Sequence, residues 1–565
     1  MELSFCIGIT SWIATKYRRS VSGGQEQNFK VLLEATLMSG KTEKFILSID
    51  LGTSGSKTAL VSTHGKIVDF EFQEVPLVLL PDGGAEQKPG DWWAAIIATS
   101  KRLLGKGRVN PDDVVAIAGS TQWAGTVAVD RDGNPLMNAI IWMDMRGAKY
   151  VRDISKGAIN IEGYGLLKLN QWIRMTGGAP GLSGKDPVGH ILLIKNEFPD
   201  VYRQTYKFLE PKDFINLCLT GEFAASHDSI TLHWITDNRD IRNISYNDKL
   251  LKLVAFDREK FPDLYRAIDI LGPLKKEVAD ELGLRPDVQV VMGSPDIHTA
   301  ALGSGAIRDF EGHIYIGTSS WIVAHVPFKK TDIVHQIASL PSSIPGRYII
   351  VNEQETAGGV LTYLKNNILY HQDELLKEEA LPDVYKIFDR IAAKVPAGSN
   401  KVIFTPWLNG ERAPVDDNSV RAGLFNLSLN NTREDIIRAF LEGVAFNQKW
   451  LLKYVEKFIG RRMDPLHIAG GGAVSDLWCQ IHADILNRTI KQVKDPIQTN
   501  ARGAAFLASV ALGFLEFEDI PKYVEINKNF EPKPQNRKIY DDMFQEYLNI
   551  YKQNRAIYKR LNSKG

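Results

Sequence analysis

The chain has 565 residues, of which 44% are hydrophobic and 24% are charged, and its formal net charge is +1. This length predicts two large domains with ample cores, and a net charge near zero argues against nucleic acid as a partner. The three cysteines lie far apart and form no CxxC pair, which argues against a zinc ribbon or a disulfide framework and is typical of a reducing compartment.

Residues 1–43 are predicted to be an N-terminal extension that is not part of the fold. Residues 3–14 are fairly apolar, but the basic residues Lys16, Arg18 and Arg19 follow this run instead of preceding it, which is the wrong polarity for a secretory signal. Met38 is an alternative start of the chain. No apolar run approaches the ~18 residues that a membrane span needs. We therefore expect a cytoplasmic protein with no membrane partner.

The first firm pattern is a strand, a Gly-Thr-Ser turn and a second strand. The first strand begins at residue 45 and ends on Asp50, the turn contains Gly52, Thr53 and Ser54, and Lys57 begins the returning strand. Such a turn offers backbone N–H groups and two hydroxyls to an anion, and the adjacent carboxylate can hold Mg²⁺ directly or through water. A plain glycine-rich hairpin explains the same residues. A third strand at 66–75 would complete an antiparallel meander.

Aromatic and polar side chains gather at predicted strand ends between residues 114 and 146. A buried strand at 114–118 leads to Gln122 and Trp123, and a short strand at 139–142 leads through Trp142 to Asp144. A polyhydroxylated ligand requires aromatic faces for its C–H groups and amide or charged partners for its hydroxyls. Tryptophans in loops can equally cover a core.

The stretch 287–305 places a carboxylate between a strand and a helix. The mostly apolar run at 288–292 predicts a buried strand, and the small residues at 299–302 predict a closely packed helix, with Asp296 between them. In α/β proteins, ligands bind at the carboxyl ends of strands, which makes Asp296 a candidate catalytic residue. Complementing the helix macrodipole is the alternative role of such a residue.

The residues that follow repeat the first pattern. Residues 313–326 again predict strand, Gly-Thr-Ser turn and strand, with Gly317 and Thr318 in the turn. The duplication predicts two domains of similar topology, 44–305 and 306–520, that present their turns to one cleft.

The last part of the chain contains a triple-glycine motif and a tail. Glycines 470–472 follow a strand and precede a helix that Ser475 caps, so they would let backbone approach a nucleoside, or serve only helix–strand packing. Residues 521–565 are predicted to form a C-terminal helical tail that is solvated from Tyr540 onward.

With these patterns assembled, the chain resembles the FGGY carbohydrate kinases, which belong to the actin-like, ribonuclease-H-like ATPase superfamily. The matching motifs run in family order and are SIDLGTSGSK (48–57), GAEQKPGDWW (84–93), IIWMDMR (140–146), GSPDIHTAALGSGA (293–306), IGTSSW (316–321), LNGERAPVDDNSVRAGLF (408–425), FLEGVAF (440–446) and AGGGAVSDLWCQIHADIL (469–486). The resemblance implies an α/β fold of two ribonuclease-H-like domains flanking a central cleft. The first domain would bind a sugar and the second would bind ATP.

The resemblance also implies a role for each matching residue. Asp296 would be the general base that deprotonates a sugar hydroxyl, and Asp50 would be the Mg²⁺-associated carboxylate. The nucleotide and its phosphates would contact Gly52, Thr53, Ser54, Lys57, Gly317, Thr318, Gly358, Gly472, Ala473 and Asp476. The sugar would contact Gln122, Trp123, Trp142, Asp144 and Asp296.

The sugar itself is the weakest part of the resemblance. Xylulose kinases carry a Met-His pair, and glycerol kinases an Arg-Glu pair, where this chain has Trp123 and Ala124. Overall likeness favours phosphorylation of a pentulose such as xylulose, with ribulose, gluconate, glycerol or another polyol as alternatives. A non-catalytic, actin-like ATP-dependent switch is a further alternative. A homodimer is the one additional partner considered.

Overall fold

The computed structural model describes residues 43–369 and 383–562, so the predicted extension at 1–43 lies outside the described residues except for Glu43. Residues from Phe45 onward form one compact unit. We call residues 45–303 of this unit the first lobe and residues 312–562 the second lobe. Among the described helices, none has the length and apolarity to cross a bilayer.

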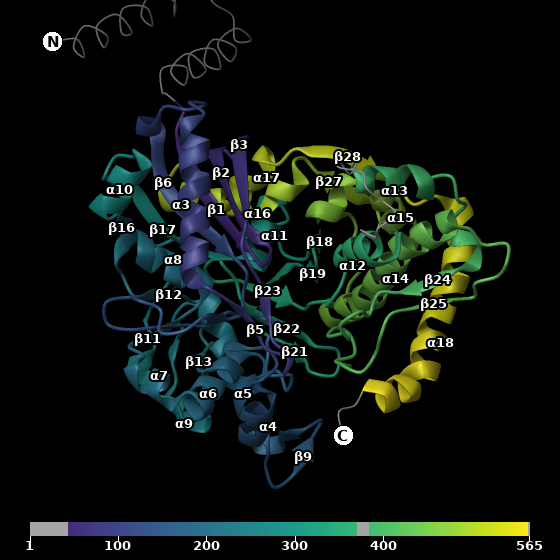
Figure 1. Ribbon diagram of the computed structural model, residues 1–565, viewed down its shortest axis with the longest axis horizontal. Coiled ribbons are helices and arrows are strands. Elements are labelled where there is room, and N and C mark those ends of the chain that lie inside the picture. The colour runs from purple at the N-terminus through teal and green to yellow at the C-terminus, as the bar shows by residue number, and fades with distance from the viewer. Residues whose placement is uncertain (1–42, 370–382, 563–565) are drawn as a thin grey trace, which may run out of the picture. The chain divides into compact units, whose positions relative to one another are not determined.

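The first lobe is built on a six-stranded sheet in the order β16-β17-β6-β1-β2-β3 (Figure 1). Its strands are β1 (Phe45–Gly52), β2 (Gly55–Ser62), β3 (Ile67–Glu74), β6 (Val114–Thr121), β16 (Ile270–Pro273) and β17 (Gln289–Pro295). The β1–β2–β3 meander is antiparallel, as predicted. In contrast, β6 runs parallel to both β1 and β17, so the carboxyl ends of these three strands meet at one edge.

Both faces of this sheet are buried at its central strands β1, β6 and β17, and the alternation along β1 shows how. Leu47, Ile49 and Leu51 share a core with Trp92 of α3 (Pro89–Gly105). Ile46 faces the other way and packs with the small side chains of α16 (Thr499–Ala511). Because successive strand residues point to opposite faces, a strand covered on both sides is almost continuously apolar.

The second lobe repeats this arrangement on a five-stranded sheet in the order β19-β18-β26-β27-β28. Its strands are β18 (Gly312–Ile316), β19 (Ser320–Val323), β26 (Leu466–Ala469), β27 (Ile490–Val493) and β28 (Ile526–Phe530). As in the first lobe, the Gly-Thr-Ser turn joins two antiparallel strands, and the first of these pairs in parallel with the next strand of the sheet. Two long helices, α14 (Arg433–Ile459) and α15 (Asp476–Leu486), pack against each other and contribute to the core of this lobe.

Smaller elements complete both lobes. A second sheet of the second lobe has the order β20-β23-β22-β21, with β20 (His325–Val326), β21 (Thr331–Asp332), β22 (Ile337–Pro341) and β23 (Tyr348–Val351). The helices of the first lobe that surround the connections are α4 (Ala148–Ser155), α5 (Leu166–Thr176), α6 (Pro187–Glu197), α7 (Pro199–Gln204), α8 (Pro211–Thr220), α9 (Asp248–Val254) and α10 (Lys276–Leu282).

Two helices with small residues cross at very close range. Helix α11 (Asp296–Gly303) packs against α16 although they are far apart in the sequence. A Cβ on Gly303 would lie 1.8 Å from the carbonyl oxygen of Thr499, and one on Gly503 would lie 1.9 Å from that of Thr299. Only glycine permits this approach, which holds the start of α11 beside the first sheet.

The C-terminal segment differs from the solvated helical tail that the sequence predicted. Residues of β28 form the edge strand of the second sheet, paired with β27. Helix α18 (Arg537–Asn562) buries Tyr540, Phe544 and Tyr547 in the second core (Figure 1). Tyr540 also donates a hydrogen bond to Glu442 at 2.7 Å. Lysine and tyrosine content suggested solvation, but the tyrosines lie at helical spacing and make one buried face.

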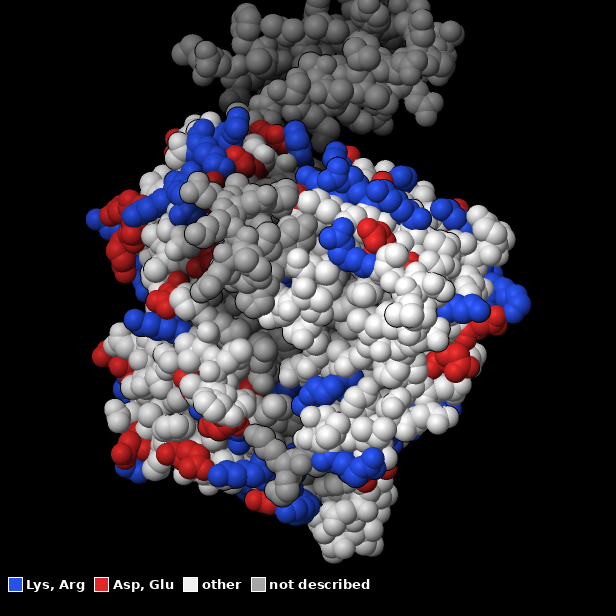
Figure 2. Space-filling model, turned by 45° about the vertical axis from the view of Figure 1, so that its right-hand side comes forward, with Lys and Arg blue, Asp and Glu red and all other residues white. Residues whose placement is uncertain are grey.

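The surface carries both signs of charge. Figure 2 shows basic and acidic side chains interspersed with uncharged ones over one face of the molecule. This agrees with the net charge of +1.

Candidate active site

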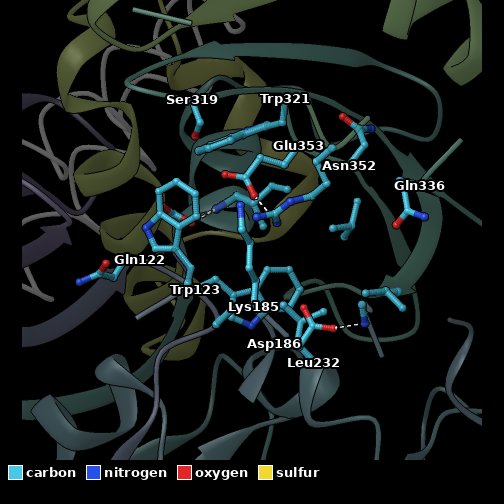
Figure 3. A pocket seen from close by; sticks show the side chains of 18 of the residues that line it. Gln122, Trp123, Lys185, Asp186, Leu232, Ser319, Trp321, Gln336, Asn352 and Glu353 are labelled. Carbon is cyan, nitrogen blue, oxygen red and sulfur yellow. Dashed lines mark hydrogen bonds and ion pairs between the residues drawn. The ribbon is translucent and has the colours of Figure 1, made fainter. Parts of the chain in front are cut away.

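A cavity of about 400 Å³ lies between the two lobes and is lined by residues of both Gly-Thr-Ser turns. Side chains of the first lobe, such as Trp123, face side chains of the second lobe, such as Glu353 and Trp321 (Figure 3). Eleven of the predicted site residues line it, namely Asp50, Gly52, Thr53, Ser54, Lys57, Gln122, Trp123, Trp142, Asp296, Gly317 and Thr318. The close arrangement of the two turns, expected from the repeat, is therefore present.

Asp296 is the first residue of α11 and follows a bulge at the end of β17. The bulge depends on Gly293, which has φ of +71° and approaches β6 so closely that a Cβ would lie 2.2 Å from the Gly119 carbonyl oxygen. The backbone N–H of Ile297 donates to Asp296 Oδ1 at 2.8 Å. Burial, followed by repulsion from Asp50 and Glu353, raises the pKa of Asp296 well above its ordinary value. A carboxylate with a raised pKa is suited to accept a proton near neutral pH.

Asp50 lies near the end of β1 and forms a short ion pair with Lys57 of β2. The two residues are directly opposite each other in the ladder, and Lys57 Nζ lies 2.6 Å from Asp50 Oδ2. Asn500 of α16 donates to the other carboxylate oxygen at 3.4 Å. The sheet and α16 thus fix Asp50 in place at the cavity, and it is nearly buried.

The first turn is held by a hydrogen-bond network that centres on Gln87. Gln87 Nε2 donates to the Thr53 carbonyl at 2.9 Å, and Gln87 Oε1 accepts from Gln122 Nε2 at 2.7 Å. Thr53 Oγ1 donates to Gln122 Oε1 at 3.1 Å and accepts from Trp142 Nε1 at 2.9 Å. Sequence reasoning had no role for Gln87, although it stands in the GAEQKPGDWW motif. It orients the turn and the amide of Gln122 together.

Asp144 was predicted to contact the sugar, but the structure places it outside the cavity. Its buried carboxylate pairs with Arg146 at 2.7 Å and accepts from the backbone N–H of Ala85 at 2.8 Å. Ala85 belongs to β5 (Ala85–Gln87), the strand that carries Gln87. Asp144 therefore supports the position of Gln87 and does not line the cavity.

Aromatic side chains form opposite walls of the cavity. Trp123 is buried, and its Nε1 donates to the Ser229 carbonyl at 2.9 Å, so its ring is fixed from the first lobe. In the second lobe Tyr315 and Trp321 are stacked, with ring centroids 4.4 Å apart. Burial raises the pKa of Tyr315 to about 12, which keeps its hydroxyl neutral at physiological pH. Trp123 belongs to a hydrophobic core and also lines the cavity.

A partly buried ionic cluster, unforeseen from the sequence, joins the two lobes beside the cavity. Arg412 Nη1 lies 2.6 Å from Glu353 and Arg412 Nε lies 3.0 Å from Glu355, which also accepts from Lys185 of the first lobe at 2.8 Å. Although burial alone would raise the pKa of Glu355, Arg412 and Lys185 lower it to about 2. The charged tip of the GERAP loop was the one sequence signal for this cluster, since Lys185 and Glu355 belong to no recognisable pattern.

Some of the predicted nucleotide contacts line the cavity, and the others lie outside it. Gly358 donates its backbone N–H to the Gly317 carbonyl at 2.8 Å, and a Cβ on Gly472 would lie 2.5 Å from Ile316, so these glycines surround the second turn. Gly358, Gly472, Ala473 and Asp476 do not line the cavity described above. Asp476 pairs with Lys528 at 2.9 Å on the exposed surface.

The triple glycine serves packing at two of its positions. Gly470 and Gly472 approach the end of β18 too closely for a side chain, whereas a Cβ on Gly471 would meet nothing within 4 Å. Ser475 caps α15 as predicted, with its side chain accepting from the backbone N–H of Trp478 at 3.0 Å.

Comparison with known proteins identifies the architecture. Residues 45–303 match the N-terminal domain of the FGGY family of carbohydrate kinases, and residues 312–512 match its C-terminal domain. A xylulose kinase of Staphylococcus epidermidis is 28% identical over 534 residues, covering 91% of this chain and 98% of the relative. A gluconokinase of Bacillus subtilis is 24% identical over 90% of this chain and 95% of the relative. The crystal structure of a ligand-bound xylulose kinase from Lactobacillus acidophilus has a TM-score of 0.78 at 25% identity and covers 92% of this chain and 100% of that chain. The predicted fold class, two actin-like α/β domains, is confirmed.

Proposed function

We propose that this chain, which belongs to the FGGY family of carbohydrate kinases, transfers the γ-phosphoryl group of ATP to a hydroxyl of a pentulose such as xylulose. It is a phosphotransferase of a family that uses ATP, and the proposal adds the sugar and the residues that act on it. Asp296 is assigned as the general base.

The position of Asp296 carries this assignment. It lines the cavity together with both Gly-Thr-Ser turns. Its raised pKa enables it to accept the proton of a sugar hydroxyl as that hydroxyl attacks phosphorus. Phosphoryl transfer needs little covalent help from the protein, so positioning and charge stabilisation supply most of the acceleration. The backbone N–H groups of Thr53, Ser54 and Thr318 and the hydroxyls of Ser54 and Thr318 are the donors that would position the phosphates from the two lobes.

Mg²⁺ is the metal that the family implies, and the residues present are compatible with it. Within residues 43–369 and 383–562 there is no group of three or more His, Cys, Asp or Glu that could hold a metal alone. Asp50 would therefore hold Mg²⁺ together with phosphate oxygens and water, which is the usual coordination of this ion. Asp296 is repelled by both Asp50 and Glu353, which makes the space around it favourable to a cation. When bound, the ion would neutralise charge on the phosphates.

The sugar assignment rests on several features of the chain. Gln122, Trp123 and Trp142 line the cavity, so they supply an amide and aromatic faces for a polyhydroxylated ligand. Xylulose kinases stand among the relatives that match most of the chain, and a gluconokinase matches nearly as much. Ribulose, gluconate, glycerol and other polyols are the alternatives.

The test is an ADP-release screen over pentuloses, hexuloses, polyols and aldonates, with the wild type and Asp296→Asn. We expect a pentulose to have the highest kcat/KM, and Asp296→Asn to lower kcat by about 10²- to 10⁴-fold, the usual contribution of a general base. The matched control is Asp280→Asn on the exposed surface of α10, which should keep wild-type activity. If the wild type phosphorylates no sugar, or Asp296→Asn keeps full activity on one, the assignment is wrong.

A further inference from the structure

The cavity between the lobes has an uneven set of charged side chains. Among the described residues that line it, three are cationic, Lys57, Lys185 and Arg412. Six carboxylates line the same space, namely Asp50, Asp186, Asp296, Asp332, Glu353 and Asp416. A ligand in this cavity therefore meets more carboxyl groups than cationic side chains.

Each of the three cations is already held by a carboxylate of the protein. Lys57 lies 2.6 Å from Asp50, and Lys185 lies 2.8 Å from Glu355. Arg412 lies 2.6 Å from Glu353 and 3.0 Å from Glu355, and of these three side chains only that of Glu355 is almost fully buried. Short, hydrogen-bonded pairs of this kind are costly to break, because breaking one leaves a buried charge uncompensated.

Several of the carboxylates, in contrast, have no cation within ion-pair distance. Asp186 accepts hydrogen bonds from Trp234 Nε1 at 2.7 Å and from the backbone N–H of Gly181 at 2.8 Å. Burial raises the pKa of Asp186, of Asp416 and of Asp296. The cavity is thus unfavourable even to its own negative charges.

We infer that the cavity selects uncharged polyols and ketoses and rejects sugar acids, because each of the three cations among its described lining residues is engaged in an ion pair. The inference rests on the proposed sugar kinase function and narrows its substrate class. A carboxylate on the sugar would lose its hydration without gaining a free cationic partner, and it would be repelled by neighbouring carboxylates. Overall sequence similarity does not distinguish neutral sugars from sugar acids, because a gluconokinase, whose name indicates a sugar acid as substrate, is among the relatives.

The first experiment compares substrates that differ only at the terminal group. Xylitol and D-xylonate form one such pair, and D-glucitol and D-gluconate form another. Titration calorimetry measures binding of each compound, and ADP release measures kcat/KM. We expect the neutral member to be favoured by a factor on the order of 100 or more.

The possible outcomes separate the inference from the proposed function. Equal or tighter binding of the aldonates overturns the inference, and their rapid phosphorylation does so while leaving the kinase function intact. If neither member of either pair, nor any ketose, is phosphorylated, the proposed function fails, and the binding ratio alone then decides the inference.

The second experiment frees a cation inside the cavity. Glu353→Gln removes the carboxylate nearest to Arg412 Nη1 and leaves a net positive cluster of Lys185, Arg412 and Glu355. We expect the ratio of the dissociation constants of the acidic and the neutral member of each pair to fall at least tenfold. The matched control is Glu86→Gln, which disrupts a 2.7 Å ion pair with Arg146 outside the cavity and should leave the preference unchanged.

A further variant guards against misfolding of Glu353→Gln. Asp186→Asn removes a negative charge from the cavity wall, while its amide oxygen can still accept the hydrogen bonds from Trp234 and Gly181. It should also reduce the preference. If the folded variants keep the wild-type preference, the charges of the cavity do not select the substrate and the inference is wrong.

Discussion

The contact between α11 and α16 is a sensitive point of the molecule, and Gly503→Ala tests it. A methyl group on Gly503 would lie 1.9 Å from the Thr299 carbonyl oxygen, whereas Cβ atoms essentially never come within about 3.0 Å of another heavy atom outside their own backbone. The helices would therefore have to separate by roughly 1 Å. Asp296 lies one turn from Thr299 on α11, and Asn500, which bonds to Asp50, lies one turn from Gly503 on α16.

Two measurements should change together. Overpacking of this size costs about 1–3 kcal/mol or more of unfolding free energy, to be measured by urea denaturation. A displacement of about 1 Å between Asp296 and Asp50 should lower kcat/KM by about 100-fold on the best sugar of the screen.

The control is Gly105→Ala at the end of α3, where an added Cβ meets nothing within 4 Å. It should retain activity and gain up to about 1 kcal/mol from helix propensity. If Gly503→Ala has the denaturation midpoint and kcat/KM of the wild type, the two helices are not held at the distance described, and the reasoning is refuted.

Three further predictions follow from burial and charge. Because the folded pKa of Asp296 is raised, its contribution to stability is complete below the ordinary pKa and is lost as pH rises through the folded pKa. Asp296→Asn should therefore raise the unfolding free energy by about 0.5–2 kcal/mol at pH 7.5 and by nothing at pH 3. The same difference between variant and wild type at both pH values would contradict this. Glu353→Gln removes one of the charges that raise the pKa of Asp296, so the acidic limb of the pH profile of kcat/KM should move to lower pH, and a limb that stays or moves upward would count against Asp296 as the base. Tyr540→Phe deletes the hydrogen bond to Glu442 and should lower the unfolding free energy by about 1–3 kcal/mol, measured by urea denaturation. An unchanged midpoint would contradict the packing of α18 against the second core.

The sequence by itself determined the fold class and pointed to the two Gly-Thr-Ser turns and Asp296 as residues of the cleft. Strand and helix patterns, the two Gly-Thr-Ser turns and the position of Asp296 are local features, because each depends on a few neighbouring residues and on backbone sterics. The duplication then placed both turns at one cleft before any contact was known. The family motifs supplied the roles proposed for Asp50 and Asp296, which no local pattern distinguished from a hairpin residue or a helix-end carboxylate.

Tertiary structure alone decided which polar residues reach the cavity. Asp144 follows a strand that ends near the site, yet its carboxylate turns to Arg146 and Ala85, because a buried charge requires partners and these were the ones available. The ionic cluster of Lys185, Glu355 and Arg412 joins segments that are about 170 and 57 residues apart in sequence. Long-range electrostatics of this kind leaves no periodic signal in a sequence, so the distribution of charged side chains around the cavity is a property of the folded chain.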